Sequence, residues 1–359
     1  MKLLKTSLQV IAVAMALFGL FLVYSSVTEY KPKPIETIIV NQNPELTDTG
    51  DTLNLLTWNI GYCGLDAGMD FFYDGGTKVR TPQKQVQENL QSIIRQLGKN
   101  DSLDFILLQE VDKKSKRSYF MDEYDSICTH LSGYHPAIAK NYIVSYVIVP
   151  LTSPMGKVDS GILTLSKSNP SQVTRHSYPG SFAWPKSLMM LKRCFLVNRY
   201  PLKNGKELLV INTHNSAYDK GGFLKKQELN FFRGFLTEEF SKGNYIIAGG
   251  DWNQSPFGLN TGLGNYDNEN GSVSRENFIP AGWKYAYCDS APSNRSITAA
   301  YEEGRTPTSV IDYFVLSPNI EALSVRTIHL KFRNSDHNPV VLKVRFSTRT
   351  ENLPVAKIQ

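Results

Sequence analysis

Residues 246–256 read Ile246-Ile247-Ala248-Gly249-Gly250-Asp251-Trp252-Asn253-Gln254-Ser255-Pro256. An apolar run ends in two glycines, and a carboxylate and a carboxamide follow, two positions apart. Because side chains two positions apart in an extended chain point to the same side, we expect Asp251 and Asn253 to face one pocket. Glycine permits a close backbone approach, and proline cannot continue a β-ladder. The stretch therefore predicts a buried strand that ends at a polar site, with Trp252 packed on its opposite side.

The rest of the chain supplies partners for this site at the ends of other apolar segments. Polar side chains stand at Asn59, Glu110, His214, Asp312 and the pair Asp336-His337. One such residue means little, since turns often begin with Asp or Asn. Taken together, they are the ingredients of metal-assisted hydrolysis. Asn59 and Glu110 are oxygen ligands suited to Mg²⁺, and His337 could act as a base with Asp336 or Asp312 as its partner carboxylate.

Apolar runs and helical periodicity outline the elements between these sites. Short apolar segments predict strands over residues 53–59, 104–110, 160–166, 195–200, 208–213, 310–316 and 339–346, and Asn204-Gly205 predicts a hairpin turn. Apolar residues at helical spacing predict helices over 82–97 and 224–240. The segment before Pro154 is mixed in character, and residues 257–306 are rich in loops. Hairpins with a few crossover helices favour an α/β fold of two packed sheets with helices outside.

The N-terminus predicts a membrane segment. Residues 6–27 form an uncharged run that follows two lysines. The strongly apolar part, residues 8–24, is about as long as the shortest membrane spans, and no Ala-x-Ala cleavage site follows it. We therefore predict an uncleaved signal anchor over 1–28, with secretion after cleavage as the alternative. The lysines place the first residues in the cytoplasm and the catalytic part outside. The polar, proline-bearing residues 29–52 predict a linker, and residues 347–359 predict a frayed tail.

The composition is that of a globular protein with a mild positive charge. Of the 359 residues, 41% are hydrophobic and 20% are charged, which suffices for one large core. The net charge of +6 favours anionic partners weakly and is not by itself a nucleic-acid signature. The four cysteines include no Cys-x-x-Cys pair, which argues against a zinc knuckle. They could form disulfides if the chain is exported, or remain buried thiols.

Six motifs, taken in order, resemble those of the endonuclease/exonuclease/phosphatase superfamily, which includes deoxyribonuclease-I-like nucleases, abasic-site endonucleases, inositol-polyphosphate 5-phosphatases and neutral sphingomyelinases. The motifs are Thr57-Trp58-Asn59-Ile60, Leu108-Gln109-Glu110-Val111-Asp112, Ile211-Asn212-Thr213-His214, Gly249-Gly250-Asp251-Trp252-Asn253, Ile311-Asp312-Tyr313 and Ser335-Asp336-His337-Asn338-Pro339-Val340. The resemblance covers residues 53–346, the expected catalytic domain. It implies a four-layer α/β/β/α sandwich of two mostly antiparallel sheets with outer helices, and a site at one end of the paired sheets.

The resemblance also implies a metal site. Glu110, helped by Asn59, would hold a catalytic Mg²⁺ against a phosphate oxygen, with Mn²⁺ as an alternative ion. Asp336 would be a further acid on the metal side. A bound divalent cation stabilises the charge that builds on a phosphate during attack.

The remaining motif residues would carry the chemistry that the resemblance implies. Asp251 would orient or deprotonate the attacking water, and Asn253 would hold the phosphoryl oxygens. His214 would donate to the phosphate or the leaving group. His337, with its partner Asp312, would serve the water or the phosphate. The choice between Asp251 and His337 as the general base stays open at this point.

The substrate is a phosphoester whose carrier the motifs leave open. We favour a membrane-lipid headgroup, hydrolysed as by a sphingomyelinase-like phosphodiesterase, because an anchor would hold the domain at a membrane. The alternatives are an extracytoplasmic nuclease acting on DNA or RNA, a phosphatase of soluble inositol or sugar phosphates, and a non-catalytic phosphate-binding module. The intact polar set argues against the last. Arg117, Lys192 and Arg193 are candidate phosphate contacts for any of these substrates, and no protein partner can be inferred.

Overall fold

The computed structural model describes residues 2–42, 44, 46, 52–99, 102–219, 221–259 and 277–347. Over these ranges the strands form two large sheets and one small pair. The first sheet has the order β1 (Ile35–Val40), β6 (Gln172–Ser177), β7 (Cys194–Pro201), β8 (Glu207–His214), β9 (Tyr245–Asp251), β13 (Asp312–Leu316) and β10 (Lys284–Ala286). The second sheet has the order β14 (Ile320–Thr327), β15 (Val340–Phe346), β2 (Leu53–Asn59), β3 (Phe105–Asp112), β5 (Gly156–Ser166) and β4 (His135–Val147). The pair is β11 (Asn294–Arg295) with β12 (Thr308–Ser309).

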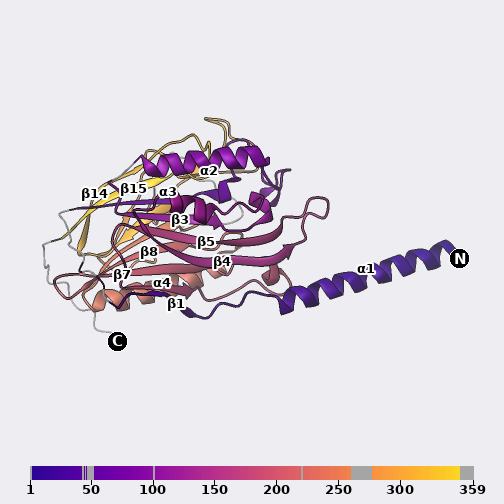
Figure 1. The fold of residues 1–359 in the computed structure, drawn as a ribbon, viewed down its shortest axis with the longest axis horizontal. Helices are drawn as coiled ribbons and strands as arrows, with labels where there is room; N and C mark the ends of the chain where they lie inside the picture. The colour runs from indigo at the N-terminus through magenta and orange to yellow at the C-terminus, as the bar shows by residue number, and fades with distance from the viewer. Residues whose placement is uncertain are drawn as a thin grey trace.

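The two sheets pack face to face, and helices cover both outer faces (Figure 1). Between the sheets lies an apolar core in which Leu107 of the second sheet meets Val210 and Phe314 of the first. Two helices cover the second sheet, and one covers the first. They are α2 (Gln83–Gly98) and α3 (Glu123–His130) on the second sheet, and α4 (Phe223–Ser241) on the first. This arrangement confirms the predicted four-layer sandwich, because burying two sheet faces against each other leaves two more for amphipathic helices.

Parallel strand pairs bring the polar strand ends together. In the second sheet β2 runs parallel to β3 and pairs Asn59 with Gln109. In the first sheet β8 runs parallel to β9 and pairs His214 with Asp251. The strand β13 then adds antiparallel to β9, with Asp312 opposite Asp251. Parallel strands end at the same edge of a sheet, so polar groups from distant motifs converge at one end of the sandwich.

Two glycines allow close packing at this end. A Cβ on Gly249 would stand 2.5 Å from the ring of Phe314, and a Cβ on Gly250 would stand 2.0 Å from the carbonyl oxygen of Thr213. Either contact is too short to exist without displacing the neighbour. Trp252 follows on the outer side, where it stacks on Tyr313 with ring centroids 5.1 Å apart, as expected for a packing residue.

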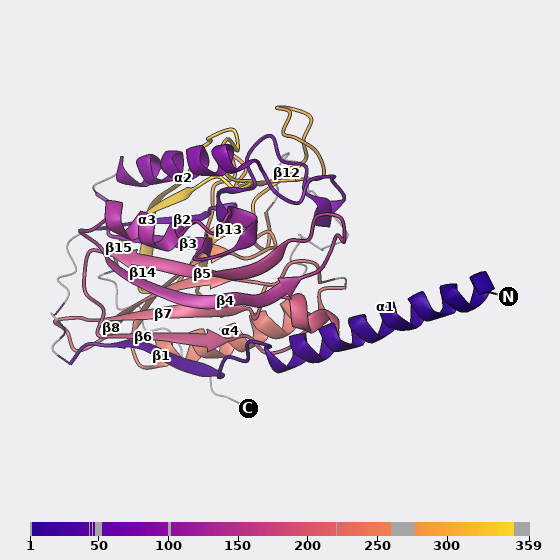
Figure 2. The same cartoon turned by 45° about the vertical axis from the view of Figure 1, so that its right-hand side comes forward.

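The N-terminal helix α1 (Lys2–Val27) projects away from the sandwich, and none of its residues is buried (Figures 1 and 2). Among the described helices, it alone is long and apolar enough to cross a membrane, and a signal sequence near the N-terminus would meet the same criterion. Strand β1 follows it and pairs antiparallel with β6. The segment 29–52, expected as a linker, therefore contributes an edge strand to the first sheet.

The segment before Pro154, which shows no clear sequence pattern, folds into α3 and the long strand β4. Short 3₁₀ turns form at Gly61–Cys63, Phe72–Asp74, Lys116–Ser118 and Lys186–Met189. The four cysteines are free thiols, and Cys63, Cys194 and Cys288 are buried. Of the predicted tail, residues 348–359 lie outside the described residues, as do residues 47–51 of the predicted linker.

Candidate active site

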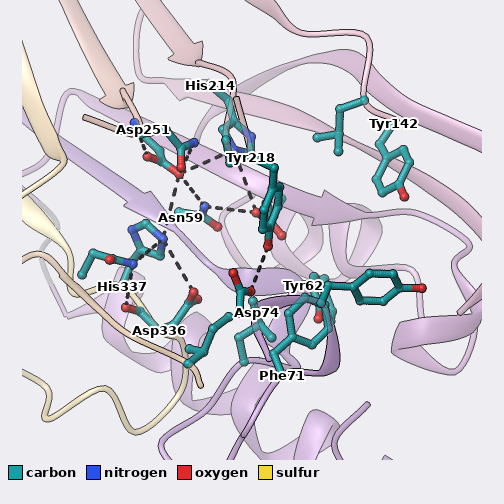
Figure 3. Close-up of a pocket in the computed structure, with 18 of the residues that line it drawn as sticks. Asn59, Tyr62, Phe71, Asp74, Tyr142, His214, Tyr218, Asp251, Asp336 and His337 are labelled. Atoms are coloured by element: carbon teal, nitrogen blue, oxygen red, sulfur yellow. Dashed lines mark hydrogen bonds and ion pairs between the residues drawn. The ribbon is translucent and has the colours of Figure 1, made fainter. Parts of the chain in front are cut away.

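A cavity of about 450 Å³ opens at the end of the sandwich where the polar strand ends meet. Figure 3 shows polar side chains on one side of it and aromatic side chains on the other. We call the polar side the floor: Asn59, Glu110, His214, Asp251, Asn253, Asp336 and His337. We call the apolar side the wall: Tyr62, Phe71, Tyr73, Met155, Met189, Leu191 and Ile297. The floor thus gathers seven of the residues predicted from separate motifs.

Asp251, the last residue of β9, is at the centre of the floor. Its Oδ2 accepts a hydrogen bond from Nδ2 of Asn59 (3.0 Å) and lies 3.5 Å from Nε2 of His214. Its Oδ1 accepts a hydrogen bond from the backbone N–H of Asn253 (2.9 Å), which has a left-handed φ of 52°. Donors on both oxygens fix the orientation of this carboxylate, so that it is held toward the cavity.

Glu110 reaches the floor through an irregularity in β3. The register of β3 against β5 shifts between Leu108 and Val111, and Glu110 itself has a φ of 55°. A bulge of this kind redirects one side chain, and a non-glycine residue in this backbone region costs on the order of 1–3 kcal/mol. The bulge turns Glu110 so that its Oε1 accepts a hydrogen bond from Nδ2 of Asn59 (3.3 Å).

His337 forms a dyad with Asp312, which lies behind the floor. Nδ1 of His337 is 2.8 Å from Oδ2 of Asp312. Burial by itself opposes a charged imidazole, but Asp312 and Asp336 outweigh that effect and raise the pKa of His337 well above its usual value. Burial raises the pKa of Asp312 to about 6, although His337 opposes this rise. We therefore assign the shared proton to His337, which makes the pair an imidazolium held by a carboxylate.

His214 differs from His337 in its environment. It is fully buried at the end of β8, and no described residue accepts or donates a hydrogen bond at its Nδ1. Burial lowers the pKa of His214 well below its usual value, and the positive charges of Arg193 and His337 act in the same direction. The floor thus holds one charged and one neutral imidazole, and the neutral one can donate a single N–H.

Oxygen donors that fit a divalent cation line the floor. Glu110 and Asp336 both present carboxylates to the cavity. Burial raises the pKa of Asp336 to about 6, and the negative charge of Glu110 adds to the rise. Two carboxylates that repel each other in a buried site fit a hard cation such as Mg²⁺, which prefers oxygen ligands. Asn59 turns its amide nitrogen to Glu110 and Asp251, and so orients the acids in this arrangement.

A second group, Asp251, Asp312 and His337, has ligand atoms within 4.8 Å of one another. Oδ2 of Asp312 and Nδ1 of His337 are already engaged with each other. This group is therefore better described as a hydrogen-bonded dyad beside a carboxylate. The pair Glu110 and Asp336 remains the better fit to a metal ion.

The wall is apolar and is built from loops. Tyr62 is fully buried, and the guanidinium of Arg117 stacks on its ring at 3.8 Å. Phe71 and Tyr73 pack together with ring centroids 5.3 Å apart, and the backbone N–H of Phe71 donates to the carbonyl of Ile297 (2.6 Å). These contacts hold the aromatic side chains in place, so the cavity offers a preformed apolar surface beside the floor.

The model of the endonuclease/exonuclease/phosphatase family matches residues 56–337, a range that contains every floor residue. This chain belongs to the endonuclease/exonuclease/phosphatase family. Enzymes of the family hydrolyse phosphoesters, including those of nucleic acids, and generally depend on a divalent metal. The floor therefore has the chemistry of a phosphoester hydrolase.

Solved structures related to the family share the fold at low sequence identity. The endonuclease/exonuclease/phosphatase from Beutenbergia cavernae DSM 12333 is 14% identical with a TM-score of 0.55, over 83% of this chain and 72% of that one. The protein from Bacteroides vulgatus is 15% identical with a TM-score of 0.52, over 82% and 99%. TDP2 from Caenorhabditis elegans is 14% identical with a TM-score of 0.52, over 82% and 74%. No curated protein matches in sequence. These likenesses show the fold alone.

The basic residues predicted to contact the phosphate lie in three different situations. Arg117 lines the cavity, but it is buried and forms a bidentate ion pair with Asp112 at 2.8 and 3.1 Å. Lys192 lies outside the cavity and pairs with Glu29 at 2.5 Å. Arg193 lines the cavity, and its buried Nη1 has no hydrogen-bond partner among the described residues. In this family member Arg193 is therefore the one of the three that is placed to meet an anion.

Several residues of the site carry no sequence motif. Nδ2 of Asn294 lies 3.1 Å from Nε2 of His337, and Ser293 accepts a hydrogen bond from the backbone N–H of Asp312 (3.0 Å). Lys225, at the start of α4, donates to the carbonyl of Asn253 (2.9 Å), and burial lowers its pKa to about 8. These residues reach the site from elements that lie outside the motifs, so the structure is needed to find them.

Proposed function

We propose that this chain is a membrane-anchored, Mg²⁺-dependent hydrolase that cleaves a phosphodiester in the headgroup of a membrane lipid. The domain would lie on the extracytoplasmic side, held by an uncleaved α1. One observation carries the choice of substrate: the cavity wall next to the catalytic floor is apolar. A membrane lipid has apolar groups close to its phosphate, and these groups can pack against apolar and aromatic side chains. A nucleic acid would instead favour an open groove of basic side chains that follows its backbone.

The basic residues of the cavity support the same choice. Arg117 is neutralised by Asp112 and packed on Tyr62. Lys225 is tied to the backbone of Asn253. Arg295 also lines the cavity, but its guanidinium donates to the backbone carbonyls of Ser296 and Asp66. Lys186 is exposed and lies over the ring of Phe182. Arg193 is therefore the described cation inside the cavity best placed to meet one phosphate, whereas a protein that tracks a nucleic-acid strand needs a row of such contacts.

The arrangement of the floor supports a role for Asp251 as the general base. Since His337 keeps its proton in the dyad with Asp312, the carboxylate of Asp251 is the group left to accept a proton from the attacking water. General bases must lie within hydrogen-bond reach of that water, and Asn59 and Asn253 hold Asp251 toward the cavity. The attack forms a bond between the water oxygen and phosphorus, and the bond to the leaving oxygen breaks.

The two histidines then serve the phosphoryl oxygens and the leaving group. The charged His337 stabilises the negative charge that builds on the phosphoryl oxygens, a preorganised electrostatic role. The neutral His214 donates a hydrogen bond from its N–H to the leaving oxygen or to the phosphate, and the leaving oxygen, which departs with the electron pair of the broken bond, takes up a proton from solvent. Asn253 helps to hold the phosphoryl oxygens. A Mg²⁺ ion held by Glu110 and Asp336 would supply Lewis-acid polarisation of the phosphate.

The test uses the full chain reconstituted in lipid vesicles, with Mg²⁺ or with EDTA. Three kinds of substrate are compared: two lipids in the vesicles (phosphatidylcholine and sphingomyelin), plasmid DNA, and a soluble aryl phosphodiester. We expect Mg²⁺-dependent headgroup release that Asp251→Ala abolishes. Turnover of DNA without turnover of lipid would reassign the protein as a nuclease, and no turnover of any substrate would identify a binding module.

A second measurement tests the metal site without activity. Mg²⁺ binding to the full chain is followed by calorimetry, with Glu110→Gln beside the exposed control Glu303→Gln. We expect Glu110→Gln to weaken Mg²⁺ binding by at least about tenfold, while the control binds as the wild type does. Equal binding by both variants would remove Glu110 from the metal site.

A further inference from the structure

An exposed apolar rim lies where the cavity, helix α1 and the β4–β5 connection come together. Leu151, at the apex of the β4–β5 connection, is 79% exposed, and Val149 beside it is 42% exposed. Trp184, in the segment that leads to the wall residue Met189, is 62% exposed. We call Val149, Leu151 and Trp184 the rim. Val149 and Lys186, which is two residues from Trp184, both line the cavity, so the two exposed segments flank the same opening. Exposed apolar side chains that flank one opening mark a candidate interaction surface.

The rim is joined to the cavity on one side. Val149 itself lines the cavity, and its carbonyl accepts a hydrogen bond from the hydroxyl of the wall residue Tyr73. Nη2 of Arg80 donates to the carbonyl of Pro154, which closes the β4–β5 connection against the loop of the wall (2.5 Å). The mouth of the cavity therefore opens beside the rim.

The rim is joined to α1 on its other side. Nε1 of Trp184 donates to Oγ of Ser26 (3.4 Å), at the C-terminal end of α1. Ser145 of β4 bonds to Thr28 (3.2 Å), the residue after the helix. Figures 1 and 2 both show the β4–β5 connection and α1 extending from the same end of the molecule. A bilayer crossed by α1 would thus have its surface at the level of the rim.

The charges around the rim suit a lipid surface. The segments 145–157 and 181–193 contain no acidic residue, and their exposed cations are Lys157 and Lys186. Nζ of Lys186 lies over the ring of Phe182 at 4.0 Å. Tryptophan is enriched at the level of lipid headgroups, and basic side chains beside apolar ones strengthen attachment to anionic lipids.

We propose that the rim inserts into the bilayer that α1 crosses, so that the cavity receives a lipid directly from that membrane without passage through water. This proposal rests on the proposed function, since it takes α1 as an anchor. It names the source of the substrate: a lipid whose apolar part stays in the bilayer while its phosphate reaches the floor.

Intrinsic fluorescence tests the position of Trp184. The chain has four tryptophans, and Trp58, Trp252 and Trp283 are buried. The full chain and its Trp184→Phe variant are reconstituted in vesicles of ordinary or brominated phosphatidylcholine, because bromine quenches tryptophan only at contact. The difference in emission between the wild type and Trp184→Phe is the contribution of Trp184. We expect this contribution to be lost in brominated vesicles. Unquenched emission from Trp184 would overturn the proposal.

The tip of the β4–β5 connection is tested by moving the tryptophan. In the Trp184→Phe background, Leu151→Trp should be quenched by brominated lipid. The matched control is Leu323→Trp, since Leu323 is 40% exposed on β14, at the opposite edge of the second sheet from β4. It should not be quenched. Equal behaviour of the two variants would show that the rim does not enter the bilayer and that a protein partner is the better occupant.

Turnover separates this proposal from the proposed function. We expect the double variant Leu151→Ser/Trp184→Ser to lose lipid turnover on the order of tenfold and to keep turnover of the soluble aryl phosphodiester. If the chain hydrolyses lipid but brominated lipid does not quench its rim tryptophan, the insertion of the rim is refuted and the proposed function stands. If brominated lipid quenches the rim tryptophan but the chain hydrolyses only DNA, the lipid substrate is refuted and the insertion of the rim stands.

Discussion

The floor and the wall of the cavity are built in different ways. The floor is carried by strand ends, so that ladder hydrogen bonds position residues such as His214 opposite Asp251. The wall is carried by the loops that contain Tyr62, Phe71 and Met189. Strand ends hold a catalytic arrangement rigidly, whereas loops tolerate changes in sequence and length. From this difference we infer that the proposed reaction and the choice of substrate depend on separable parts of the chain.

The largest effect is expected at the centre of the floor. Asp251→Asn keeps the size of the side chain but removes the proposed base, so we expect kcat to fall about 10³-fold on lipid and soluble substrates alike. The control is Asp289→Asn, because Asp289 is exposed and does not line the cavity. A fall confined to the lipid substrate would contradict the division between floor and wall.

The next effect is expected behind the floor. Asp312→Asn removes the charge that holds the proton on His337 (2.8 Å). We expect kcat to fall about 10²-fold on every substrate with KM little changed, while the thermal unfolding midpoint stays close to that of the wild type. If the lost activity tracks a lost fold in the circular dichroism melt, Asp312 is structural only.

A smaller and selective effect is expected at the wall. Met189→Ser replaces an apolar lining side chain with a polar one, and we expect kcat/KM for vesicle lipid to fall about tenfold relative to that for the soluble aryl phosphodiester. The matched control Met121→Ser changes the same residue type away from the cavity. An equal loss on both substrates would show that the wall supports the floor instead of selecting the substrate.

The smallest effect is expected at Asp74, which lines the cavity together with the floor and the wall (Figure 3). Burial raises the pKa of Asp74 to about 6, although a hydrogen bond from Tyr218 (2.8 Å) opposes the rise. The carboxylate is therefore charged above about pH 6 and neutral below it. For a lipid with a cationic choline headgroup, KM should rise as the pH falls through 6. The reason is that protonated Asp74 no longer attracts the choline, a loss of about 1 kcal/mol of binding free energy. Asp74→Asn should remove this pH dependence, and a KM profile shared by both proteins would exclude the role.

Local patterns in the sequence predict much of the floor. Gly249, Gly250 and Asp251 follow an apolar run, and this order requires a strand that packs closely and then ends in a polar site. The bulge that turns Glu110 is different, because nothing near Glu110 signals a left-handed residue inside a strand. Asn294 and Ser293 reach the dyad across the fold from a loop-rich region, so no spacing in the sequence could reveal them.

Charge and composition predict less well than motifs. Arg117 and Lys192 are basic residues near motif positions, yet Asp112 and Glu29 take up their charges in the folded chain. Asp112 is only five residues from Arg117, whereas Glu29 is 163 residues from Lys192. The fold decides which acid reaches each cation, so position in the sequence alone does not show which cation stays available. Strand β1 could not be predicted for a similar reason, since Pro32 and Pro34 just before it suggest a linker, while its pairing partner β6 lies far along the chain.

The short connection between α1 and β1 has a consequence for how this protein would meet its substrate. Helix α1 ends at Val27 and β1 begins at Ile35, which leaves residues 28–34 between them. Seven residues span at most about 25 Å, and Glu29 is already paired with Lys192. With α1 in a membrane, as proposed, a catalytic domain tethered by this connection would stay at the membrane surface. Its search would be two-dimensional, and its rate would follow the surface density of enzyme and lipid, not their concentrations in solution.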